Sequence, residues 1–174
     1  MVLNHKSFLV LAMLCVSGCT GAPIDLYVDK SMPECKIDGV LESVSFFEET
    51  FDKPILNVIM VSKKHRAFNG LYAPANSITV TAGVIRAADD GHERSHWIPG
   101  RAISSRITLQ TLRGCQEHAL ETHVVAHEIM HSFGFGHLKG KSFQQYVMYG
   151  NTAYLGMLLT DKQFNKINRL VNDR

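Results

Sequence analysis

The segment HEIMHSFGFGH, residues 127–137, constrains the fold of this chain more than any other stretch. Successive residues of an α-helix turn by about 100°, so positions four apart lie about 40° from each other. His127 and His131 have that spacing, and their imidazoles therefore point the same way, one turn apart. Gly134 can end the helix in a left-handed conformation that residues with a Cβ rarely adopt. This turn would bring His137 back towards the other two histidines, so the sequence predicts that three imidazoles meet at one point.

Three imidazoles at one point predict a catalytic metal ion. Zinc binds histidine nitrogen at about 2.0–2.1 Å, and a site with three protein ligands keeps its fourth position open. Glu128 is rotated by about 100° from His127, which is wrong for a ligand but suits a base beside the open position. Zinc would lower the pKa of a bound water and polarise a carbonyl, and Glu128 would pass the water's proton to the leaving amine. The motif therefore predicts one Zn²⁺ ion and hydrolysis of peptide bonds.

The same residues resemble a known family. HEIMHSFGFGH matches the signature HExxHxxGxxH of the metzincin zinc metallopeptidases. The sequences VVA at 124–126 and YVMYG at 146–150 are most similar to the matrixin branch of that family. The resemblance implies that the metal ligands and the general base are His127, His131, His137 and Glu128.

The resemblance also assigns roles to the residues that follow the motif. It implies that Met148 lies in the Met-turn, as an apolar floor under the metal, and that Tyr149 follows it directly as in matrixins. Astacins place a metal-binding tyrosine where this chain has Gly150, so we expect no tyrosine ligand. In metzincins the segment after the Met-turn lines the pocket for the residue that follows the cut. Residues 149–159 carry no charge here, which predicts cleavage before medium or large apolar residues.

The order of the expected elements indicates an α+β domain. We expect helices over residues 39–51, 117–134 and 160–171, strands over 55–61, 77–85 and 101–112, and a long polar loop over 86–100. The strand over 55–61 is expected to be buried, and Thr160 with Gln163 is expected to form a capping box. The resemblance implies a metzincin-like zincin. Its small twisted mixed sheet would be followed by an active-site helix, the Met-turn and a C-terminal helix, with 101–112 or 77–85 as the edge strand along the cleft.

The N-terminus predicts export from the cell. Lys6 precedes a continuous apolar run over residues 8–16, which is typical of a secretory signal peptide and too short to span a bilayer. The sequence VSGC, residues 16–19, resembles a bacterial lipobox, which implies a signal peptide over 1–18 and lipidation of Cys19. The alternative is an ordinary secretory signal that is cut near residue 18 or 22.

The lipobox reading divides the chain into three parts. Residue 20 is threonine and not aspartate, which by resemblance to Gram-negative sorting rules implies an outer-membrane lipoprotein, anchored in the membrane by its lipid. We expect residues 19–34 to be the lipid anchor and tether, and residues 35–174 to be the catalytic domain.

The cysteine count predicts one disulfide bond. The chain has four cysteines, of which Cys15 leaves with the signal peptide and Cys19 would carry the lipid. Cys35 and Cys115 remain, and an exported protein can oxidise them to a disulfide. The alternative is that Cys35 is a latency cysteine that blocks the metal.

Composition narrows the class of partner. The chain has 174 residues, 45% of them hydrophobic and 20% charged, with a net charge of +2, as in an ordinary globular domain. No basic run is long enough to indicate nucleic acid. We expect a monomer that binds an extended polypeptide substrate. Two other functions fit the sequence: a non-catalytic lipoprotein that keeps its metal and binds peptides or proteins, and a zinc amidase for cell-wall crosslinks.

Further histidines lie near the motif and before it. His123 is one turn before His127 and is expected to be either a partly exposed helix residue or a contact of the metal ligands. His92 and His96, in the polar segment over 86–100, are expected either to be solvated or to hold a second metal.

Overall fold

The structure of the chain is a computed structural model that describes residues 22–69, 73–84, 91–98, 102–111, 114–150 and 153–172. The expected signal peptide and Cys19 lie outside the described residues. Within them, none of the helices has both the length and the apolar character needed to cross a membrane.

The domain is built on a five-stranded sheet with the strand order β2-β1-β3-β5-β4. The strands are β1 (Ile24–Asp29), β2 (Leu56–Val61), β3 (Ser77–Gly83), β4 (Gly91–Ile98) and β5 (Ala102–Gln110). The first four in spatial order run parallel, and β4 pairs with β5 in the antiparallel sense. A small mixed sheet with helices confirms the expected α+β class.

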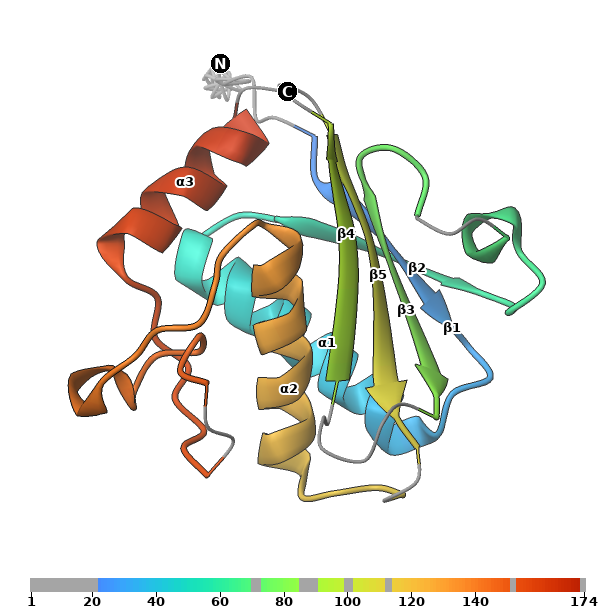
Figure 1. Ribbon diagram of the computed structural model, residues 1–174. Helices are drawn as coiled ribbons and strands as arrows, with labels where there is room; N and C mark the ends of the chain where they lie inside the picture. The colour runs from blue at the N-terminus through green and yellow to red at the C-terminus, as the bar shows by residue number, and fades with distance from the viewer. Residues whose placement is uncertain are drawn as a thin grey trace, which may run out of the picture.

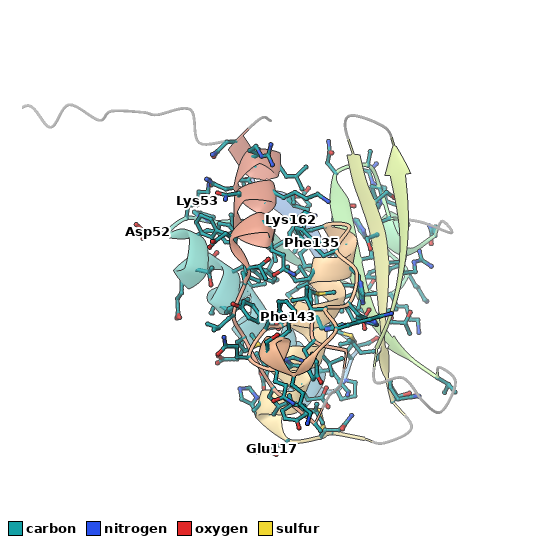
Figure 2. The ribbon with its side chains drawn as sticks, turned by 60° about the vertical axis from the view of Figure 1, so that its left-hand side comes forward. Asp52, Lys53, Glu117, Phe135, Phe143 and Lys162 are labelled. Atoms are coloured by element: carbon teal, nitrogen blue, oxygen red, sulfur yellow. A yellow bond between two sulfur atoms is a disulfide. The ribbon has the colours of Figure 1, made fainter. Side chains whose placement is uncertain are left out.

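The α-helices of the described residues all lie on one side of this sheet: α1 (Glu34–Phe51), α2 (His118–Ser132) and α3 (Asp161–Asn172). Figure 2 shows the sheet nearly edge-on at the right, with the helices on its left. The core between the layers is made by alternate residues of the strands and by apolar stripes of the helices, among them Leu26, Ile78, Ile107, Phe47, Val125 and Ile129. Two short 3₁₀ helices, η1 (Arg66–Phe68) and η2 (Lys141–Phe143), lie in the connecting segments.

The expectation that residues 19–34 are a tether is wrong for the part that forms the first strand. Residues 24–29 are not part of a tether, because β1 pairs with β2 on one side and with β3 on the other. Its sequence IDLYVD alternates apolar and polar residues, and Ile24, Leu26 and Val28 are all fully buried. The folded domain therefore begins by Ile24 and not at residue 35. The helix α1 likewise begins at Glu34, earlier than residue 39.

The two edges of the sheet also differ from expectation. Residues 91–98 form β4 and not a loop, so β4 is the edge strand beside α2, while β3 and β5 lie inside the sheet. The polar sequence of β4 does not predict a strand, because backbone pairing at a sheet edge requires no alternation of apolar residues. At the other edge, β2 is not a buried strand, since Met60 is 42% exposed.

The predicted capping box at the start of α3 is confirmed. The Thr160 backbone N–H donates to Gln163 Oε1 at 2.8 Å, and the Gln163 N–H donates to Thr160 Oγ1 at 3.3 Å. The segment between α2 and α3, which contains η2, extends away from the sheet (Figure 1).

Two tertiary links join α1 to the first turn of α2 and to the residues just before it. Cys35 and Cys115 form the predicted disulfide, with Cα atoms 5.9 Å apart. One residue further on, Lys36 Nζ lies 2.6 Å from both carboxylate oxygens of Glu121, and both side chains are buried. These links fix the N-terminal end of the helix that carries the histidine motif.

Candidate metal centre

The three motif histidines converge as predicted. His127 and His131 lie on α2, and His137 follows the turn after it. Nε2 of His137 lies 3.0 Å from Nε2 of His127 and 3.1 Å from Nε2 of His131. This group can hold a metal ion.

The turn that returns His137 is a Schellman motif. Gly134 has φ = 78°, in the left-handed region. Its N–H donates to the His131 carbonyl at 2.7 Å, and the Phe135 N–H donates to the Met130 carbonyl at 3.2 Å. Both bonds are those expected when a glycine follows the last helical residues. The role predicted for Gly134 in the turn is therefore confirmed.

Backbone carbonyls orient two of the imidazoles. Nδ1 of His127 lies 2.7 Å from the Val147 carbonyl oxygen, and Nδ1 of His131 lies 2.8 Å from the Phe135 carbonyl oxygen. A carbonyl can only accept, so each Nδ1 carries the hydrogen and each Nε2 presents a lone pair to the centre. This is the arrangement in which histidine ligands are held in metal sites.

The nitrogen geometry fits a bound cation. Nε2 of His137 carries at most one hydrogen, so it can donate to only one of the two neighbouring Nε2 atoms. Without a cation, its contact with the other Nε2 atom would bring two lone pairs face to face. A tetrahedral ion with bonds of 2.0–2.1 Å separates its ligand nitrogens by about 3.3 Å. The two observed separations, 3.0 and 3.1 Å, are within a few tenths of an ångström of that value.

His127 is held in the neutral form that binds metal. Burial lowers its pKa to about 4, an effect that its hydrogen bond to the Val147 carbonyl opposes and that the nearby His131 and His137 reinforce. At neutral pH no proton therefore competes with a metal ion for the Nε2 lone pair.

Glu128 lies on the side of α2 that faces the sheet. Ser132, one turn later on the same face, donates to Ser105 Oγ of β5 at 2.7 Å. Glu128 itself is 8% exposed, and α2 contacts both β4 and β5. Glu128 thus lies between the helix face that carries His127 and His131 and the sheet. Its role as a base stays a prediction.

The segment around Met148 contacts His127 and the residue after His137 through its backbone. Met148 is fully buried in the core. Its carbonyl accepts from the Leu138 N–H at 2.8 Å, next to His137, while the preceding residue, Val147, accepts from His127. The buried position agrees with the expected floor, and its place under a metal stays a prediction.

The two residues after Met148 have different neighbours. The ring of Tyr149 packs edge-on against Tyr154 at a centroid distance of 5.5 Å. Gly150 lies under the His137 ring, so close that an added Cβ would sit 3.3 Å from His137 Cγ. The expectation that no tyrosine is a metal ligand stays a prediction.

Of the two alternatives expected for His123, the partly exposed helix residue is wrong. The side chain is 1% exposed, and its Nδ1 lies 3.1 Å from the Gly156 carbonyl oxygen. Its ring centroid is 6.0 Å from that of His127. The spacing of four residues from His127 was the available signal, because it places His123 on the same stripe of α2.

The question of a second metal at His92 and His96 concerns side chains outside the described residues.

Comparison of the chain with models of known protein families gave no match, and comparison with curated proteins gave none either.

Proposed function

We propose that the protein is a zinc-dependent endopeptidase of the metzincin type. The observation that carries the proposal is the convergence of three Nε2 atoms at 3.0 and 3.1 Å, in a motif whose second residue is a carboxylate. Such a site has three nitrogen ligands and an open position, which is the pattern of catalytic zinc.

Each residue of the motif has a separate task in the proposed reaction. His127, His131 and His137 would hold the ion through Nε2. When bound, zinc would activate a water molecule and polarise the scissile carbonyl. Glu128 would take the proton of that water on its carboxylate and deliver it to the nitrogen of the leaving amine. Because Glu128 is nearly buried, the proton transfer would take place largely shielded from bulk solvent.

The edge strand β4 is the proposed docking site for substrate backbone. One side of β4 pairs with β5, and β4 ends the sheet on its other side. An extended peptide can pair with such an edge through main-chain hydrogen bonds, which gives affinity with little dependence on sequence. Because β4 lies beside α2, the bound peptide would run past the histidine cluster.

Side chains after Met148 would supply the preference for apolar residues. Tyr154, Leu155 and Leu158 are 41%, 38% and 52% exposed, whereas Met157 and Leu159 pack against the core. The exposed three can therefore contact substrate. Burial of a leucine-sized side chain against them would contribute roughly 1.5–3 kcal/mol, while a charged side chain would be penalised by desolvation.

We further propose that a lipid on Cys19 holds the domain close to the outer membrane. Only residues 20–23 separate Cys19 from the start of β1 at Ile24. At about 3.3–3.6 Å per residue, that length of chain reaches at most about 18 Å. A lipid-anchored enzyme of this form would act on polypeptides at the membrane surface. Labelled fatty acid fed to cells that express the chain, and to cells that express Cys19→Ala, tests the anchor.

A peptide library tests the proposed activity. The mature chain is loaded with zinc and incubated with peptides of random sequence, with and without a chelator, and the cut sites are read by mass spectrometry. We expect cuts before apolar residues that the chelator abolishes. A zinc-loaded protein that binds peptides without cutting them would instead support the binding lipoprotein, and cleavage of cell-wall crosslinks alone would support the amidase.

A further inference from the structure

A buried histidine outside the ligand set is used by nothing in the proposed reaction. His123 is one turn before His127 on α2 and is 1% exposed. Its Nδ1 lies 3.1 Å from the carbonyl oxygen of Gly156, so Nδ1 donates and Gly156 accepts. A buried polar side chain that donates to a distant loop fixes the position of that loop.

The loop in question, residues 153–159, lies directly against the chain before Met148. The Leu158 N–H donates to the Gln145 carbonyl at 3.0 Å, and the Val147 N–H donates to the Leu158 carbonyl at 3.0 Å. At Gly156 the two stretches touch, because a Cβ added there would lie 2.2 Å from the backbone carbon of Gln145. No side chain fits at that position without a shift of the backbone.

Two histidines of α2 hold the two paired stretches. His127 donates from Nδ1 to Val147 on the first stretch, and His123 donates from Nδ1 to Gly156 on the second. One turn of helix therefore sets both the orientation of a metal ligand and the position of the loop. The helix is thus connected to the loop directly, through the bond from His123 to Gly156, and indirectly, through Val147, which bonds both His127 and Leu158.

The exposed apolar side chains of the loop surround the point that His123 holds. Tyr154 and Leu155 precede Gly156, and Leu158 follows it, and all three are partly exposed. Met157 packs against the core on the other side of the loop. A small shift at Gly156 would consequently move the exposed side chains that are proposed to contact substrate. The packing of Met157 against the core would oppose that shift.

We propose that His123 is a positioning residue that sets substrate preference by holding residues 153–159 through Gly156. The inference rests on the proposed peptidase function and deepens it. His123 touches neither the metal nor the reacting atoms, so its effect is on the binding of the substrate side chain and not on the chemical step. Loss of the hydrogen bond raises KM for peptides with an apolar residue after the cut, with kcat nearly unchanged.

Three variants separate this role from a general structural one. His123→Leu keeps the bulk and removes the donor, whereas His123→Asn places an amide N–H about where Nδ1 lies. His118→Leu is the matched control, because His118 is an exposed histidine at the start of the same helix. Should His123→Leu not fold, His123→Gln replaces it, since its amide lies one bond too far out for the Gly156 carbonyl.

The experiment combines hydrogen exchange with cleavage kinetics on zinc-loaded protein. We expect exchange in residues 153–159 to become about tenfold faster in His123→Leu, and KM for the preferred peptides to rise several-fold, with kcat within twofold of wild type. Zinc content stays the same, His123→Asn restores most of both effects, and His118→Leu shows neither. Exchange in 153–159 that is unchanged in His123→Leu, or a failure of His123→Asn to restore it, overturns the inference. Faster exchange in a protein that cuts no peptide contradicts the peptidase function alone.

Discussion

The two ends of α2 are fixed by different means. At its beginning, a buried ion pair in the first turn and a disulfide just before the helix join this end to α1. At its end, imidazoles donate to carbonyls, and a glycine turn returns the chain to the helix. The contacts at the beginning of α2 include none of the three clustered histidines, whereas the contacts at its end surround them. From this difference we predict that stability and metal binding can be changed separately along one helix.

The largest expected effect is loss of the disulfide at the stabilising end. Cys35 and Cys115 are separated by 80 residues in the sequence, and closing a loop of that length contributes roughly 4–5 kcal/mol in the chain-entropy model. Cys35→Ser/Cys115→Ser should therefore unfold at much lower denaturant concentration. Zinc content below the unfolding transition should equal that of wild type. Free thiols in the native protein, with activation by a thiol reagent, would instead support the latency cysteine.

The buried ion pair should come next. Lys36→Met leaves the Glu121 carboxylate buried without its partner, and such a loss costs about 3–5 kcal/mol. Lys36→Met/Glu121→Leu should regain most of that stability, although the Gln116 N–H also donates to Glu121 at 2.9 Å. Lys64→Met, at an exposed lysine, is the control. Denaturant unfolding and zinc titration together decide the matter, and a Lys36→Met protein that is stable but binds zinc poorly would break the comparison.

The end of α2 that carries the histidine cluster should respond to acid when metal is absent. Burial lowers the pKa of His127 to about 4, below its ordinary value near 6.5. The unfolded chain then takes up a proton in a range where the folded chain does not, so stability rises with pH between about 4 and 6.5 and is lost as the pH falls. The full effect is roughly 3 kcal/mol. Unfolding of the chelated protein across this range measures it. His127→Gln should reduce the dependence, and part of what remains comes from His123, whose pKa is also lowered by burial.

The smallest effect is expected at the turn. Gly134→Ala forces a Cβ into φ = 78°, which costs about 1–2 kcal/mol, and it should displace His137 and weaken zinc affinity about tenfold. Gly136→Ala is the matched control, because nothing lies within 4 Å of a Cβ added there and its φ is not positive. Equal zinc affinity in the two variants, measured by competition with a chromogenic chelator, would show that the turn does not position His137.

The sequence predicted features that depend on local spacing and missed those that depend on distant pairing. The histidine convergence, the turn at Gly134 and the box of Thr160 with Gln163 follow from helix geometry within a few residues. The carbonyls that orient the imidazoles could not be predicted, because Val147 reaches His127 only through the course of the chain after the motif. Burial of His123 likewise depends on Gly156, which lies far along the chain.

The strands show the same division. The segment IDLYVD of β1 alternates in the manner of a strand, but its place between β2 and β3 requires pairings with residues 56–61 and 77–80. The polar sequence of β4 carries no alternation that distinguishes it from a loop, and only its antiparallel partner β5 defines it. Edge strands of this kind are recognised by their neighbours and not by their own residues.

Metal content and turnover, measured together in two variants, test the central claim most directly. Glu128→Ala should keep one zinc per chain and lose about 10²–10⁴ in kcat, because a general base contributes that much. His131→Ala should lose both the metal and the activity, while His118→Ala, at an exposed position of the same helix, should lose neither. A Glu128→Ala protein that cuts peptides at nearly the wild-type rate, or a His131→Ala protein that keeps its zinc, would contradict the assignment of separate ligands and base.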